Sequence, residues 1–236
     1  MKAIINYQNL RNFAYSNDHL IEKDIKGIVI NFYGLGDMRM FDEDPVRGVE
    51  YAMHDILYVI PYTNPWCWMN EEAVLYVDEI IRVLCEKYQL KDDIKIVSTG
   101  GSMGGLSALV YSCYAKITPI ACVTNCPVCD LVYHFTERLD LPRTLYSAFF
   151  NFNGSMEEAL RLRSPYHLVE KMSKIDYTIF HCEKDKAVNL ELHSVKFVEA
   201  MKEKHKINLI KVPLRGHCDL SAEAMLKYEE IILSYF

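Results

Sequence analysis

Short apolar runs alternate with longer amphipathic segments along most of the chain. Near-continuous apolar runs of four to eight residues are typical of strands in a parallel sheet covered on both faces. Such runs occupy residues 27–32, 56–61, 94–98, 120–124, 177–182 and 207–212. A weaker pattern predicts an additional N-terminal hairpin at 3–15, from Ala3 to Tyr15.

The clearest helical pattern runs from Asn70 to Tyr88. Asn70 is a suitable N-cap, two acidic residues follow it in the first turn, and apolar residues recur on one face. Segments 103–114, 190–204 and 221–235 also have the helical period. The alternation of strands and helices predicts one α/β domain over residues 1–236, with a doubly wound, mostly parallel sheet and helices on both faces.

Residues 127–164 break this rhythm, because they contain helical fragments and many aromatic residues but no good strand. An insertion between two strands, at the edge of the sheet where ligands bind, is expected to form a small helical cap or lid. An ordinary long crossover is the alternative.

Composition excludes several partners. The 236 residues are 50% hydrophobic and 25% charged, with a formal net charge of -6 and no run rich in Lys and Arg, which argues against nucleic acid or an anionic membrane. No apolar run has the length of a bilayer-spanning helix, and the first residues lack the apolar stretch of a signal peptide. The eight cysteines favour free thiols in a reducing cytoplasm over an exported, disulfide-bonded protein.

The candidate chemistry centres on Gly100-Gly101-Ser102-Met103-Gly104, which has the pattern G-x-S-x-G. A predicted strand leads into it and a predicted helix leads out, which is the context of a nucleophile elbow. The turn would expose the Ser102 hydroxyl and direct the Met103 N–H at a bound group. A phosphate-binding turn is the alternative, but the glycine spacing differs from G-x-G-x-x-G and no Lys follows.

A nucleophilic serine needs a base and an acid, which on this fold follow later strands in the order Ser, acid, His. Asp185 follows the strand at 177–182 and His217 follows the strand at 207–212. Glu183 is the alternative acid, and Asp219 is expected to cap the last helix. The other histidines lie within strands or helices, in the insertion, or before the serine.

The oxyanion of a tetrahedral intermediate requires two backbone donors. Met103 N–H is one candidate. The loop after an early strand supplies the other, which we assign to Leu35 N–H with Gly34 N–H as the alternative.

These features resemble the α/β-hydrolases and, among them, the catalytic domain of prolyl oligopeptidase-like serine hydrolases. The motifs that carry the resemblance are Tyr33-Gly34-Leu35-Gly36, Gly100-Gly101-Ser102-Met103-Gly104-Gly105, Arg163-Ser164-Pro165, the pattern H-x-x-x-D-x-x-V from His181 to Val188, and Gly216-His217. The resemblance implies an α/β-hydrolase fold, a Ser102, Asp185, His217 triad and no cofactor. It extends from about residue 27 to the end.

The sequence departs from that family in two ways. The oligopeptidases usually carry an N-terminal propeller for which this chain has no room, and Tyr33 stands where many carboxylesterases have the His of a His-Gly pair. We therefore expect hydrolysis of an ester, and less readily of a peptide amide, through an acyl-enzyme. An acyltransferase, an oligopeptidase and a non-catalytic binding protein remain alternatives. The expected partner is a small ester or short peptide, and a homodimer is left open.

Candidate substrate contacts are Tyr33 and, in the loop after the second core strand, Trp66 and Trp68, whose indoles would form apolar walls. Buried indoles that anchor the loop are the alternative. Arg138 and Arg143 are candidates to pair with a substrate carboxylate, although internal ion pairs of the insertion are favoured.

The spacing C-x3-C-x2-C of Cys122, Cys126 and Cys129 suggests a metal site only superficially. A fourth ligand at suitable spacing is missing, so no metal is expected there.

Overall fold

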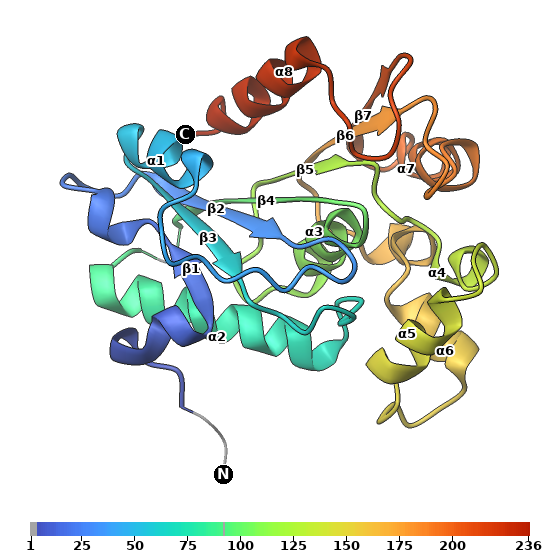
Figure 1. Cartoon of the computed structure of the whole chain (residues 1–236), viewed down its shortest axis with the longest axis horizontal. Coiled ribbons are helices and arrows are strands. Elements are labelled where there is room, and N and C mark those ends of the chain that lie inside the picture. Colours follow the sequence, from blue (N-terminus) through green and yellow to red (C-terminus); the bar gives the residue numbers. More distant parts are fainter. Residues whose placement is uncertain (1–3, 92) are drawn as a thin grey trace.

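The computed structural model describes residues 4–91 and 93–236, which form a seven-stranded sheet with the order β1-β3-β2-β4-β5-β6-β7 (Figure 1). Strands β2 to β7 pair in parallel, and β1 pairs with β3 in antiparallel orientation. The strands are β1 (Ala14–Ser16), β2 (Gly27–Phe32), β3 (Ile56–Pro61), β4 (Lys95–Gly101), β5 (Ala121–Asn125), β6 (Asp176–Cys182) and β7 (Lys206–Val212).

The helices cover the sheet and fill the segment between β5 and β6. They are α1 (Val46–Met53), α2 (Glu71–Tyr88), α3 (Met103–Tyr114), α4 (Leu131–His134), α5 (Leu141–Ala148), α6 (Met156–Leu162), α7 (Lys196–Met201) and α8 (Ala222–Leu233). Shorter helical turns are η1 (Tyr7–Asn12), η2 (Asp18–Leu20), η3 (Pro165–Lys171) and η4 (Glu191–Val195). In the described residues, no helix combines the length and the apolar character that a bilayer crossing requires.

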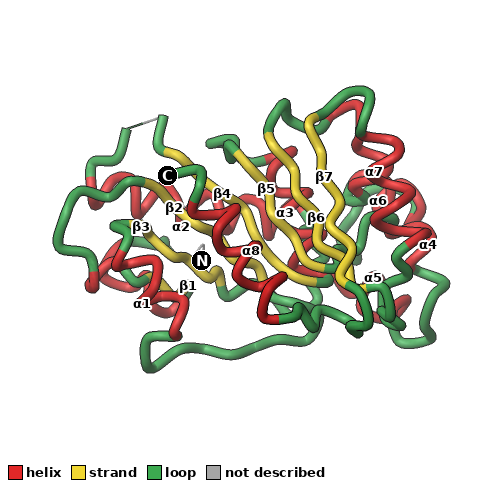
Figure 2. The backbone as a smooth tube through the Cα atoms, turned by 90° about the horizontal axis from the view of Figure 1, so that it is seen from above, coloured by secondary structure: helices red, strands yellow, loops and turns green. Residues whose placement is uncertain are grey.

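Side chains alternate between two hydrophobic cores, one on each face of the sheet. Ile28 and Ile30 of β2 point to the face covered by α2, α3 and α7, whereas Val29 points to the face covered by α1 and α8. In Figure 2, α8 crosses in front of the strands and α3 lies behind them. Burial on both faces explains why the strands were recognisable as continuous apolar runs.

The sequence predicted the core strands and the main helices correctly. Segments 27–32 and 56–61 coincide with β2 and β3, and the remaining core strands differ from expectation by a few residues at their ends. Asn70 caps α2, with its side chain accepting a hydrogen bond from Ala73 N–H. The predicted helix at 190–204 forms as η4 followed by α7.

The predicted N-terminal hairpin is wrong. Tyr7–Asn12 forms a 3-10 helix, capped by the Asn6 side chain, and only β1 follows as a strand. Ala3, the start of the predicted hairpin, lies outside the described residues. Local hydrogen bonding of Asn6 and Asn9 provides the backbone with an alternative to strand pairing.

The segment at 127–164 contains α4, α5 and α6, which lie together at the lower right of Figure 1. It contacts the loop after β3 through specific hydrogen bonds. Trp68 Nε1 donates to Thr144 Oγ1 at 3.0 Å, and Asn70 Nδ2 donates to Ala148 O at 2.8 Å. The segment is thereby attached to the end of the sheet at which β3 terminates.

Candidate active site

Ser102 occupies a strained turn between β4 and α3. Its backbone angles are φ 58° and ψ -123°, a conformation that non-glycine residues rarely adopt. The surrounding backbone holds this turn in place, because Ser102 N–H donates to Asn125 O at 3.0 Å and Ser102 O accepts from Leu106 N–H at 3.1 Å. Backbone strain enforced by neighbouring contacts is the expected geometry of a nucleophile elbow.

The glycine of the elbow is required by a close approach of two backbones. A Cβ added to Gly104 would lie 2.2 Å from Phe32 O, the last carbonyl of β2. No side chain fits at that distance, so α3 can begin beside β2 only with glycine at this position. The pattern G-x-S-x-G is thus explained by packing rather than by flexibility.

Asp185 and His217 lie on the loops after the neighbouring strands β6 and β7 and are directly hydrogen-bonded. His217 Nδ1–H donates to Asp185 Oδ2 at 2.6 Å. The other carboxylate oxygen, Oδ1, accepts from the backbone N–H groups of Ala187 at 2.8 Å and Val188 at 3.0 Å. The Asp185 side chain is fully buried, whereas 28% of the His217 side chain is exposed.

In this pair the pKa of Asp185 is lowered and the pKa of His217 is raised. Burial raises the pKa of Asp185, but hydrogen bonds from His181, His217 and the Val188 N–H outweigh it and leave the pKa well below its usual range. Burial lowers the pKa of His217, but hydrogen bonds to Asp185 and Cys126 and the charge of Asp185 raise it to about 9. An ionised carboxylate thus fixes the imidazole tautomer and makes its Nε2 a strong base.

The second imidazole nitrogen of His217 is not bonded to the serine in this structure. Its nearest hydrogen-bonding partner is Cys218 Sγ at 3.7 Å, and Ser102 Oγ has no hydrogen-bond partner among residues 4–91 and 93–236. The His217 loop nevertheless lies beside the elbow, since a Cβ added to Gly101 would be 3.1 Å from Cys218 Sγ.

The candidate oxyanion donors come from two segments, the start of α3 and the loop after β2. Met103 is the first residue of α3, where backbone N–H groups have no acceptor within the helix. The loop after β2 is held by a hydrogen bond from Gly36 N–H to Pro65 O at 3.0 Å. A Cβ on Gly34 would lie 3.9 Å from Gly101 O, so the backbone of Gly34 and Leu35 passes close to the elbow.

The residues predicted to contact the substrate lie in different environments. Trp68 is fully buried and bonded to Thr144, which is the anchoring role weighed as the alternative for the indoles. Arg138 forms an ion pair with Asp140 at 2.6 Å, so the guanidinium is already paired within the insertion.

Tyr33 is buried and donates its hydroxyl proton to Arg39 O at 2.7 Å, while its ring stacks on Tyr62. The guanidinium carbon of Arg143 lies 5.4 Å from the centre of the Trp66 ring.

A cavity of about 490 Å³ lies between the loop after β3 and helices α5 and α6. Trp66 is the one candidate contact that lines it, and neither Ser102 nor His217 does. Arg163, which the sequence indicated only as part of the Arg163-Ser164-Pro165 motif, also lies in its wall. Its wall combines aromatic residues with polar and charged ones. The aromatic residues are Tyr62, Tyr76, Phe149, Phe150 and Phe152, and the charged ones include Glu71 and Glu72.

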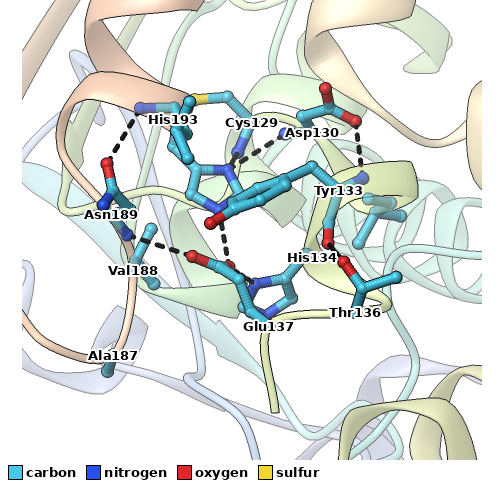
Figure 3. Close-up of polar contacts among 12 residues, drawn as sticks. Cys129, Asp130, Tyr133, His134, Thr136, Glu137, Ala187, Val188, Asn189 and His193 are labelled. Atoms are coloured by element: carbon cyan, nitrogen blue, oxygen red, sulfur yellow. Dashed lines mark hydrogen bonds and ion pairs between the residues drawn. The ribbon is translucent and has the colours of Figure 1, made fainter.

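A second buried polar cluster joins the insertion to the rest of the domain (Figure 3). Glu137 Oε2 accepts from His134 Nδ1 at 2.5 Å and from His193 Nε2 at 2.8 Å. His193 Nδ1 accepts from the N–H groups of Cys129 at 3.1 Å and Asp130 at 3.2 Å. Sequence analysis missed this cluster, whose one local signal was the i, i+3 spacing of His134 and Glu137.

This cluster is unsuited to metal binding despite its two histidines and carboxylate. Because two backbone N–H groups point at His193 Nδ1, that nitrogen must be the acceptor and Nε2 must carry the proton. A metal would need the lone pair of Nε2. The cluster therefore connects protein segments through hydrogen bonds.

Comparison with known proteins identifies the family of the chain. Residues 77–236 match the sequence model of the prolyl oligopeptidase family. The chain belongs to that family. The expected α/β-hydrolase fold is thereby confirmed. No curated protein matches the chain.

Solved structures with the same fold include peptidases and esterases. A puromycin-hydrolyzing peptidase of Mycobacterium tuberculosis matches with a TM-score of 0.72 and 16% identity, over 91% of this chain and 34% of that one. Esterase B of Lactobacillus rhamnosis matches with a TM-score of 0.69 and 12% identity, over 91% of this chain and 76% of that one. Esterase Est2 of Thermogutta terrifontis matches with a TM-score of 0.64 and 20% identity, over 90% of this chain and 81% of that one. The chain thus spans about a third of the length of that peptidase.

Proposed function

We propose that Ser102, Asp185 and His217 form a catalytic triad that hydrolyses a carboxylic ester through an acyl-enzyme. The observation that carries the proposal is the 2.6 Å hydrogen bond between Asp185 and His217, on adjacent strand ends beside the strained Ser102 elbow. These three residues have the order and the post-strand positions that the family chemistry requires.

In the acylation step, His217 Nε2 accepts the Ser102 Oγ proton while Oγ attacks the ester carbonyl carbon. The N–H of Met103 and the N–H of Leu35, or of Gly34, stabilise the negative oxygen of the tetrahedral intermediate. The imidazolium then protonates the departing alcohol. In the second half, the same nitrogen activates water to release the acid, and Asp185 remains ionised throughout.

The free protein must adjust before this step, because His217 Nε2 faces Cys218 rather than Ser102. Catalytic hydrogen bonds are often long in unliganded enzymes and shorten with substrate bound. The backbone before His217 is loosely packed, since a Cβ on Gly216 would meet no atom within 4 Å.

An ester is the favoured substrate class because two of the similar structures are esterases, which the chain matches over most of both lengths.

The test compares p-nitrophenyl esters of increasing acyl length with peptide p-nitroanilides. We expect the ester series to be turned over faster, and Ser102→Ala to lower kcat/KM by about 10⁴-fold or more. Ser234→Ala, an exposed serine beyond α8, is the matched control and should retain activity. Equal turnover by the wild type and Ser102→Ala would refute the triad, and faster amide cleavage would refute the ester preference.

Labelling with a fluorophosphonate probe tests the nucleophile without assuming a substrate. The wild type and Ser234→Ala should be labelled, whereas folded Ser102→Ala should not. Analysis of products in the presence of added alcohols separates hydrolysis from acyl transfer, because both routes share the acyl-enzyme.

A further inference from the structure

Two thiols lie beside His217 Nε2 and have no part in the proposed hydrolysis. Cys126 directly follows β5, and Cys218 follows His217. The two sulfur atoms and Nε2 all lie within 4.8 Å of one another, and Cys218 Sγ is 3.7 Å from Nε2. In a tetrahedral zinc site the ligand sulfur and nitrogen are about 3.6 Å apart, given Zn–S and Zn–N bonds of about 2.3 and 2.0–2.1 Å.

Both cysteines have unusual backbone conformations. Cys126 has φ 47° and Cys218 has φ 55°, which is the left-handed region that non-glycine residues seldom occupy. Outliers of this kind cluster at functional sites.

The groups around the three atoms suit metal ligation. Asp185 accepts the Nδ1 proton of His217, which makes Nε2 the nitrogen that can ligate a metal once its own proton is lost, as in carboxylate–histidine–zinc arrangements. Cys126 Sγ accepts from the N–H groups of Cys182 at 3.3 Å and Cys218 at 3.4 Å, which hold the sulfur in place beside the imidazole. The His193 ring discussed above has the opposite arrangement, with its Nε2 carrying the proton.

A neighbouring amide is incompletely bonded. Asn125 Nδ2 donates to Cys218 O at 3.1 Å, yet the buried Asn125 Oδ1 has no hydrogen-bond partner in the described part of the chain. A buried acceptor without a partner indicates that a further polar group or water can be accommodated nearby.

We propose that Cys126, Cys218 and His217 bind Zn²⁺, with solvent as the fourth ligand, and that the bound ion inhibits the hydrolase. On binding, the two thiols lose their protons to the buffer, as does Nε2 of His217 where the imidazole is protonated, and the two thiolates neutralise the charge of the ion. Thiolate and imidazole ligands favour zinc over Mg²⁺ or Ca²⁺.

Access to this site is from the side of His217 and Cys218, which are partly exposed, whereas Cys126 is fully buried. Inhibition follows because Zn²⁺ would occupy the same Nε2 lone pair that accepts the serine proton. The binding step rests on the geometry alone, and the inhibition rests on the proposed function of His217.

Co²⁺ serves as a spectroscopic probe of binding, because thiolate-to-cobalt charge transfer absorbs in the near ultraviolet. Metal-free protein in a reductant that does not bind metals is titrated with Co²⁺ and then with Zn²⁺. We expect one equivalent to bind, with a thiolate band that Zn²⁺ abolishes and Mg²⁺ does not. Cys218→Ser should weaken binding by at least about 100-fold, since even residues that only orient a ligand contribute 10–100-fold. Cys113→Ser, a distant half-buried cysteine, is the matched control.

Ester hydrolysis provides the second readout, with each variant normalised to its own rate without metal. Zn²⁺ should inhibit the wild type and Cys113→Ser, with full recovery on adding EDTA, while Cys218→Ser should need at least about 10-fold more Zn²⁺. Cys126→Ser replaces Cys218→Ser if circular dichroism shows that the latter is unfolded.

The outcomes separate the two proposals. Absence of a thiolate band in the folded wild type, or an unchanged band in Cys218→Ser, overturns the metal site even if esters are hydrolysed. A thiolate band in a protein that hydrolyses no ester and is not labelled by the fluorophosphonate supports the metal site and refutes the proposed function. Hydrolysis that persists with the site saturated by Zn²⁺ overturns the inhibition.

Discussion

Substitution of Glu137 by Gln tests the cluster that joins the inserted helices to the domain (Figure 3). Burial raises the pKa of Glu137, but hydrogen bonds from His134 and His193 lower it to about 2, from 4.5 for an unperturbed glutamate. The side chain is only 11% exposed, so solvent screening is limited. A difference of this size corresponds to about 3 kcal/mol of folding free energy, as an upper bound.

The sign of the pH dependence follows from the lowered pKa. The contribution is fully present above the unfolded pKa and is lost as the pH falls through about 2, the folded value. At pH 7 we expect Glu137→Gln to be about 2–3 kcal/mol less stable, with Tm lower by about 4–12 °C for a domain of this size. At pH 3.5 the difference should be smaller by about 1 kcal/mol.

Urea unfolding followed by circular dichroism at both pH values measures the effect. Glu157→Gln is the matched control, because Glu157 forms an exposed i, i+4 ion pair with Arg161 on α6, with 63% of its side chain accessible. Its loss should change the free energy of unfolding by less than about 0.5 kcal/mol. If Glu137→Gln and Glu157→Gln have the same stability at pH 7, the reasoning about the cluster is wrong.

Further predictions concern His217, Gly104 and Trp68. Since Asp185 outweighs burial and raises the pKa of His217 to about 9, kcat/KM for esters should rise between pH 7 and 9 as the imidazole loses its proton, and a plateau from pH 7 would contradict this. Gly104→Ala should abolish activity and folding measured by circular dichroism, because its Cβ would lie 2.2 Å from a carbonyl oxygen. Trp68→Phe removes the hydrogen bond to Thr144 and should lower the free energy of unfolding by about 1–2 kcal/mol in denaturant titrations.

The sequence was sufficient to predict the parallel strands β2 to β7 and the strand-to-helix turn at Ser102. Parallel strands buried on both faces produce apolar runs that need no tertiary information, and the elbow has a local steric cause at Gly104. Strand ends were less certain, since β4 continues to Gly101 only because β5 pairs with it there.

Features that depend on the backbone conformation of single residues, or on contacts between residues far apart in the chain, could not be predicted from the sequence. Trp66 and Trp68 are two residues apart, yet φ 43° at Trp68 turns its indole into the core while Trp66 lines the cavity. Glu137 and His193 are 56 residues apart, and no periodicity connects them. The position of Cys218 against His217 likewise depends on a left-handed backbone that the amino-acid type does not indicate.

The burial of Trp68 against α5 also equips the molecule with an optical reporter. The chain has only two tryptophans, and Trp68 is enclosed between the loop after β3 and the inserted helices, bonded to Thr144. Movement of α5 away from the sheet would admit water to this indole and shift its emission to longer wavelength. With Trp66 replaced by Phe, intrinsic fluorescence would follow the opening of the inserted segment in real time, without any attached dye.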